Sequence, residues 1–187
     1  MRIVPIFPAR KPAIYAAQYD GEPVDELNKV FAQWSDVFWL EPFFEMHKHD
    51  LRHGYYGSFN VQEAAMQTIV DVCDMRKRLF SLALQGQSDR KNTLQNMFMP
   101  LGNEMRLAVL QKSKAKMRVQ GRGSWLRLYA IRVAPNLFVI TGGAIKLTHR
   151  MEEREHTRVQ LDKLEKVKRF LADKGFFDVN DFELMEI

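Results

Sequence analysis

The sequence has 187 residues and a mass of 21.9 kDa, the size of one ordinary domain. Hydrophobic residues make up 46% and charged residues 27%, which are globular values and exclude a wholly disordered chain. The single cysteine, Cys73, excludes an internal disulfide and zinc sites built from several thiolates, and it fits a reducing compartment. No uncharged apolar run approaches the roughly 18 residues of a membrane span, and the first residues are not expected to form a signal peptide. We therefore expect a cytoplasmic protein without membrane contact.

Basic residues are concentrated in one part of the chain. Residues 105–158 contain 12 basic and 3 acidic residues, whereas residues 1–104 contain 11 and 13 and residues 159–187 contain 5 and 7. A local excess of positive charge predicts a site for a polyanion. The alternative is a solvated basic face that has no partner.

The first elements expected are two short strands, over residues 3–7 and 14–19, followed by a turn at residues 20–23. A helix then begins near Val24. Its apolar stripe has helical spacing and consists of Leu27, Val30, Phe31 and Trp34. Residues 37–58 are rich in aromatic side chains, and we expect them to pack across the core.

A long helix is predicted from Asn60 to Gly86. Asn60 can cap it, and Glu63 stands at the capping-box position. The expected core-facing residues are Ala65, Ile69, Val72, Cys73, Phe80, Ala83 and Leu84. In this setting Cys73 is expected to be a buried, inert thiol. A second, short helix is expected over residues 92–99.

The basic block contains the predicted sheet. Strands are expected over residues 125–133 and 137–141, with a third over residues 117–119. A last helix is expected over residues 157–173, with Gly175 just beyond its end and Phe176, Phe177 and Phe182 packing back onto the core. The prediction is a single α+β domain over residues 1–187. It has N-terminal helices, one of them long, then a late antiparallel β-sheet and a C-terminal helix.

Arg127 and Tyr129 are expected to project side by side from one face of the first long strand, because side chains alternate along a strand. A buried arginine must reach a carboxylate, solvent or an anion. One interpretation is an internal pair between Arg127 and a carboxylate. The functional interpretation is a phosphate clamp, with Tyr129 stacking or exchanging a proton.

The segment after the return strand carries further polar chemistry. Gly142 and Gly143 allow close backbone approach or form a bulge, and Lys146, His149 and Arg150 follow. RNA cleavage by a 2′-hydroxyl needs a base, an acid and cations near the phosphate, and it needs no metal. His149 titrates near neutral pH and suits the first two roles, although it also fits a plain surface residue.

Other basic residues and a histidine cluster complete the candidates. The predicted nucleic-acid contacts are Lys112, Lys114, Lys116, Arg118, Arg132 and Arg150, and the alternating lysines suit either a phosphate backbone or edge protection. Residues 45–53 contain His47, His49 and His53, but neither helical nor extended spacing supplies three metal ligands without a carboxylate. We expect no metal and no cofactor.

The C-terminal half resembles a known family. The features that carry the resemblance are Phe98-Met99-Pro100-Leu101-Gly102, the lysine-rich segment 112–118, the strands Trp125–Tyr129 and Phe138–Thr141, and Lys146-Leu147-Thr148 before a final helix. Over roughly residues 94–172 the chain is similar to the RelE/HigB-type toxins and their phage-derived relatives. Residues 21–93 would then be a helical, aromatic-rich insertion into a RelE-like core.

The resemblance implies a function and its site. It implies a bacterial, ribosome-associated mRNA endonuclease that needs no metal and is neutralised by an antitoxin protein. Carried over residue by residue, the site would consist of Arg127, Tyr129, Lys146 and His149. The alternatives are a module that binds RNA or another nucleic acid without cutting it, and a protein-interaction domain that uses residues 37–58.

Overall fold

A computed structural model of the chain describes residues 1–6, 13–53, 56–57, 59–102, 109–119 and 121–183. Six strands form one mixed sheet in the order β1-β2-β8-β7-β4-β3, and β5 and β6 form a separate two-stranded ribbon. The strands are β1 (Arg2–Pro5), β2 (Ile14–Gln18), β3 (Phe98–Pro100), β4 (Gln111–Ala115), β5 (Arg118–Val119), β6 (Arg122–Gly123), β7 (Leu126–Ala134) and β8 (Leu137–Ile145). The helices are α1 (Glu26–Ser35), α2 (Val37–Met46), α3 (Lys48–His53), α4 (Val61–Gln85), the 3₁₀ turn η1 (Leu94–Asn96), α5 (Glu155–Asp173) and α6 (Val179–Glu183).

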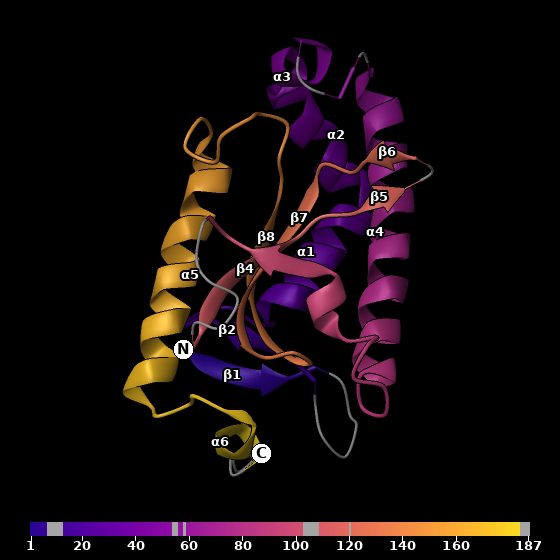
Figure 1. Cartoon of the computed structure of the whole chain (residues 1–187). Coiled ribbons are helices and arrows are strands. Elements are labelled where there is room, and N and C mark those ends of the chain that lie inside the picture. The colour runs from indigo at the N-terminus through magenta and orange to yellow at the C-terminus, as the bar shows by residue number, and fades with distance from the viewer. Residues whose placement is uncertain (7–12, 54–55, 58, 103–108, 120, 184–187) are drawn as a thin grey trace.

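The sheet is sandwiched between two helical layers. The helices α1, α2 and α4 cover one face, where they bury a core that includes Trp34, Phe44, Trp125 and Leu128 (Figure 1). The helix α5 covers the other face, where Tyr129, Ile131 and Leu164 belong to a second core. This arrangement confirms the α+β class, the long N-terminal helix and the C-terminal helix.

The expectation of a purely antiparallel, late sheet is wrong. The N-terminal strand β2 joins the sheet and runs parallel to β8, with Ile14 opposite Phe138 and Ala16 opposite Ile140. Its residues Ile14 to Ala17 are buried, because both faces of the sheet are covered there. The sheet therefore joins a strand near the N-terminus to a strand in the C-terminal half of the chain.

The helix starts follow the sequence signals. Asp25 caps α1 and accepts from the backbone N–H groups of Leu27 and Asn28, both at 3.0 Å, and the predicted apolar stripe of α1 is buried. Asn60 and Glu63 form the predicted capping box of α4, and Gly86 caps its other end.

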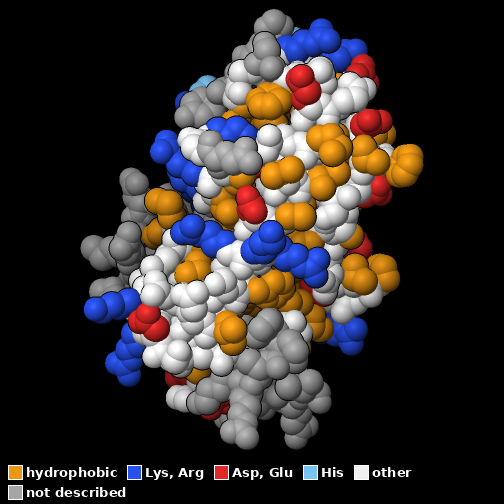
Figure 2. Space-filling model, turned by 90° about the vertical axis from the view of Figure 1, so that its right-hand side faces the viewer, with side chains coloured by type: hydrophobic (Ala, Val, Ile, Leu, Met, Phe, Trp, Pro, Cys, Tyr) orange, Lys and Arg blue, Asp and Glu red, His pale blue; other side chains and the backbone are white. Residues whose placement is uncertain are grey.

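The core-facing side of α4 follows the prediction only in part. Ala65, Val72 and Ala83 are buried as predicted, and Ile69 and Phe80 are half-buried and pack against the core. The other buried residues of the helix include Thr68, Met75 and Leu79. Cys73 and Leu84 are consequently exposed rather than buried. Figure 2 looks onto the side of the molecule formed by α4 and shows hydrophobic side chains spread over that surface.

Two predicted elements near the sheet are also corrected. The helix expected over residues 92–99 is only the short turn η1, because Phe98 pairs with Ala115 in the sheet and stacks on Phe138 at a ring distance of 4.7 Å. The strand expected over residues 117–119 is the short strand β5, which pairs with β6 in the separate ribbon, and the neighbour of β7 in the sheet is β4. The tail packs back through Phe176 and Phe182, whereas Phe177 is exposed.

Gly142 and Gly143 lie inside β8, which extends further than predicted. Tyr129 pairs with Gly142 and Ala130 pairs with Ile140, so Thr141 is the extra residue of a bulge. A side chain at Gly143 would meet the Trp34 ring at 2.7 Å. The glycine therefore permits the close packing of α1 on β8.

Candidate functional site

Three cations converge on the α5 face of the sheet, close to the first residues of β7. Lys114 on β4 pairs with Tyr129 and so shares its face, and Arg127 lies two residues before Tyr129 on the same face. Arg127 pairs in turn with Ala144 of β8, and Lys146 follows Ala144 by two residues. We call Lys114, Arg127 and Lys146 the cation cluster.

Arg127 is held by neutral groups. Its Nη1 donates to the backbone oxygens of Ser124 at 2.5 Å and Leu126 at 2.7 Å, and its Nη2 donates to the Tyr56 hydroxyl at 2.8 Å. Asp71 of the long helix accepts from Arg122 instead. Within the described part of the chain, the hydrogen bonds of Arg127 therefore fix its position and bring no carboxylate to it.

The pKa values of the two lysines in the cluster are lowered. Burial, followed by the nearby charges of Lys116 and Arg127, lowers the pKa of Lys114. Burial and then Arg127 also lower the pKa of Lys146, and Glu153 partly opposes them. The Lys146 amine donates to the backbone oxygens of Thr148 and His149, both at 2.5 Å. Like charges held together on a half-buried surface favour the binding of an anion.

Tyr129 lies on the same face of the sheet as the cluster, opposite Lys114, and is fully buried. Its hydroxyl has no hydrogen-bond partner among the described residues, and burial raises its pKa well above the usual value. Arg127, the second influence, lowers that pKa. The phenol is therefore neutral, and its ring belongs to the core beneath α5 together with Leu164.

His149 and Arg150 lie in the loop that joins β8 to α5, and both are exposed. The backbone oxygen of His149 accepts a hydrogen bond from the Lys146 amine. The structure thus brings Arg127, Tyr129 and Lys146 together and places the exposed residue His149 next to Lys146.

The other predicted contacts divide into three groups. Lys116 and Arg118 are exposed close to the end of β4, beside the cluster. Lys112 is neutralised by Glu165 of α5 at 2.8 Å. Arg132 donates to the Gln95 side chain at 2.9 Å from the far end of β7, and burial lowers its pKa.

The histidine segment forms a structural cluster. The Asp50 carboxylate, the nearest acid, is 3.9 Å from His47 Nδ1 but forms its close pair with Arg154, whose Nε lies 2.7 Å away. Among the described residues no group of three or more His, Cys, Asp or Glu side chains could hold a metal ion, and the side chain of His53 lies outside the description.

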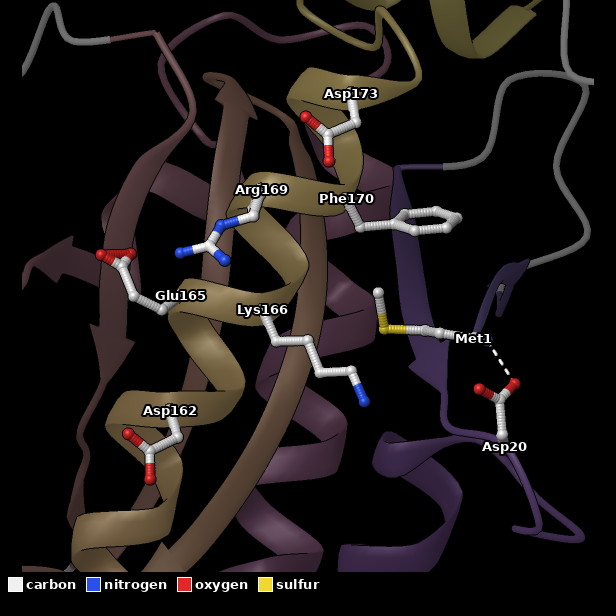
Figure 3. A pocket seen from close by; sticks show the side chains of 8 residues that line it. All are labelled: Met1, Asp20, Asp162, Glu165, Lys166, Arg169, Phe170 and Asp173. Carbon is white, nitrogen blue, oxygen red and sulfur yellow. Dashed lines mark hydrogen bonds and ion pairs between the residues drawn. The ribbon is translucent and has the colours of Figure 1, made fainter.

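A separate open hollow of about 590 Å³ lies between α5 and the start of the chain at Met1 and Asp20 (Figure 3). Its charged side chains are Asp20, Asp162, Glu165, Lys166, Arg169 and Asp173, and the N-terminal amine of Met1 donates to Asp20. Because acids outnumber bases here, this hollow does not suit a polyanion.

Sequence reasoning missed Tyr56 as the hydroxyl that holds Arg127, and no local signal near Tyr56 marks that role.

Comparison with family models, with curated proteins and with solved structures finds no match to this chain. Within the described residues, no helix combines the length and the apolar character that a membrane crossing requires.

Proposed function

We propose that this protein binds single-stranded RNA through the cation cluster. The observation that carries the proposal is the crowding of Lys114, Arg127 and Lys146 on one face, where burial and mutual repulsion lower the pKa of both lysines. A phosphodiester would relieve that repulsion and accept hydrogen bonds from the lysine amines.

The neighbouring geometry favours a chain of phosphates over a single anion. Lys114 and Lys116 are two residues apart at the end of β4, where successive same-side residues are spaced by about 6.6 Å. Arg118 and Arg150 are further exposed cations on adjoining segments. An extended single-stranded RNA could therefore follow β4 and cross β7 toward Lys146.

The experiment is fluorescence anisotropy with a labelled single-stranded RNA. Three phosphate contacts would weaken binding by about 20-fold between 50 and 200 mM salt. Lys114→Gln and Lys146→Gln should each weaken binding several-fold, and Lys91→Gln, an exposed lysine in the loop before η1, is the matched control. Binding that neither salt nor the two variants weaken would refute the proposal.

Cleavage of the bound RNA is a second candidate, which also follows from the resemblance to RelE/HigB-type toxins with their RelE-like core. The exposed His149 beside Lys146 favours it, because an imidazole there could exchange protons with a phosphodiester held by the cluster. Tyr129 is fully buried, so it would not exchange a proton with the RNA. The test is RNA incubated with chelator, in which cyclic-phosphate ends should form with the wild type and not with His149→Ala. If the RNA stays intact when it is saturated with protein, and expression causes no growth arrest, cleavage is refuted and only the binding proposal stands.

A further inference from the structure

The long helix α4 carries a second apolar stripe on the side that faces away from the core. Its large exposed hydrophobic residues are Met66 at 58%, Leu84 at 55% and Val70 at 42%. Figure 2 shows hydrophobic side chains along this side of the molecule. The full stripe, which we call the outer stripe, consists of Met66, Val70, Cys73, Lys77, Phe80 and Leu84.

The spacing of the outer stripe is that of a coiled-coil seam. Its members follow one another at intervals of four, three, four, three and four residues, which is the heptad pattern of positions that face a second helix. The other side of the same helix is already occupied, because Val72, Met75 and Leu79 are buried in the core. A helix that is apolar on both sides buries both of them in its functional state. The outer stripe therefore calls for another helix.

The charge on the outer stripe indicates which helix fits. Lys77, its one charged member, lies near the middle of the stripe and is exposed. In a parallel pair of two copies of α4, each Lys77 would meet Lys77 of the second copy, and like charges would be held together in the seam. A parallel self-pairing is therefore unfavourable.

An antiparallel pair of two copies avoids this repulsion. When the two stripes are centred on each other, Lys77 lies opposite Cys73 of the second copy. At 3.6 residues per turn, Asp74 and Lys77 turn toward the same flank of the stripe, and a twofold axis brings equal flanks together. The half-buried Asp74 of each copy then lies beside Lys77 of the other, so the pair of opposite charges forms twice.

We infer that two copies of this chain associate through an antiparallel pairing of α4. Large apolar side chains then face each other in the outer layers of the seam. The opposed positions are Met66 with Leu84, Val70 with Phe80, and Cys73 with Lys77.

This pairing leaves the cation cluster open. The helix α4 covers one face of the sheet, whereas the cluster lies on the α5 face (Figure 1). The inference is therefore independent of the proposed function. Lys114→Gln, which should weaken RNA binding, should leave dimer formation unchanged, and a dimer that binds no RNA would refute only the proposed function.

The experiment is sedimentation equilibrium of the full chain over the micromolar range of concentration. The mass should rise from 21.9 kDa toward twice that value. Val70→Lys places a new cation opposite Phe80 and next to Lys77 of the second copy, so it should raise the dissociation constant of the dimer at least about tenfold. Val179→Lys on α6 is the matched control, because Val179 is 40% exposed, and it should leave the constant unchanged.

Both valines are exposed, so neither substitution opens the core, and equal unfolding midpoints of the two variants check this. A protein that stays monomeric at every concentration, or a dimer that Val70→Lys leaves unchanged, overturns the inference.

Disulfide crosslinking tests the direction of the pair. In a Cys73→Ser background, Met66→Cys combined with Leu84→Cys should give a covalent dimer on mild oxidation, because these positions face each other. Met66→Cys alone should stay uncrosslinked, since its two copies would lie ~27 Å apart along the helix at 1.5 Å per residue. A covalent dimer of the Met66→Cys variant would show a parallel pair, and a double variant that stays uncrosslinked would show another register; either result overturns the inference.

Discussion

The guanidinium of Arg122 and the carboxylate of Asp71 join the small ribbon to the long helix. Arg122 Nη2 lies 2.7 Å from Asp71 Oδ1, and the acid side chain has no solvent exposure. The same guanidinium lies 5.0 Å from the centre of the Trp125 ring. Because the pair spans β6 and α4, it fixes the ribbon beside the strand that carries Arg127.

Arg122→Met should destabilise the protein by about 3 kcal/mol, because it leaves the Asp71 charge buried and unpaired. Chemical denaturation measures this change. The double variant Arg122→Met with Asp71→Asn should recover part of the loss. Arg118→Met, an exposed arginine on β5, should change the free energy of unfolding by no more than about 0.5 kcal/mol. If Arg122→Met lowers the free energy of unfolding no more than Arg118→Met does, the pair between Arg122 and Asp71 contributes little to stability.

Gly143→Ala should destabilise the fold by about 1–3 kcal/mol, because its new carbon would lie 2.7 Å from the Trp34 ring and 3.1 Å from the backbone oxygen of Arg127. Thermal and chemical unfolding measure the loss. Gly123→Ala is the control, since the nearest atom to its new carbon is 3.9 Å away on Tyr56. A tolerated alanine at Gly143 would contradict the tight contact between α1 and β8.

Local signals predicted where α1 and α4 begin, whereas the helix expected over residues 92–99 is only the turn η1. Asn60 with Glu63, and the apolar stripe from Leu27 to Trp34, depend only on neighbours a few residues apart. The mixed sheet could not be predicted in this way, because the pairing of Ile14 with Phe138 joins residues far apart in the sequence. The strand β4 was hidden as well, since its buried residues Gln111 and Ser113 are polar.

The candidate site was predicted in part. Alternation along β7 placed Arg127 and Tyr129 on one face, and the return strand brought Lys146 beside them. The depth of Tyr129 could not be foreseen, because it depends on how α5 packs over the sheet. The partner of Arg127 was equally hidden, since Tyr56 lies 71 residues away in the chain.

Lys114→Met should raise the free energy of unfolding by about 0.5 kcal/mol at neutral pH while it weakens RNA binding, because it removes one of several mutually repelling charges. Lys112→Met is the matched control on the same strand and should give no gain, since Lys112 is paired with Glu165. A loss of stability in Lys114→Met would contradict the repulsion.

The same lysine pKa shifts predict a pH dependence at the basic end. The folded protein lowers the pKa of Lys114 and Lys146, so the unfolded chain keeps these protons to higher pH. Their contribution to stability should therefore rise as the pH increases through the lowered values toward 10.5. Denaturation at pH 7.5 and 9.5 should show a gain that is smaller in Lys114→Met than in the wild type.

His47 and His156 pack ring to ring at 4.7 Å between α2 and the start of α5. Burial, and then the charge of His156, lowers the pKa of His47, while Asp50 raises it and Arg154 lowers it. Burial also lowers the pKa of His156, although its hydrogen bond with the Ile145 oxygen at 2.8 Å opposes this.

Acid should therefore weaken the fold through this pair. Above the unfolded histidine pKa of 6.5 both rings are neutral in the folded and the unfolded state. In this pH range the histidine pair does not reduce the free energy of unfolding. As the pH falls below that pKa, the unfolded chain binds protons that the folded protein resists, so stability decreases until the lowered pKa values are passed. We expect a loss of about 1 kcal/mol between pH 7.5 and 5.5 in denaturant unfolding. His47→Phe removes one proton site and its repulsion of His156, so its loss should be clearly smaller, and an unchanged pH slope in that variant would exclude the pair as the cause.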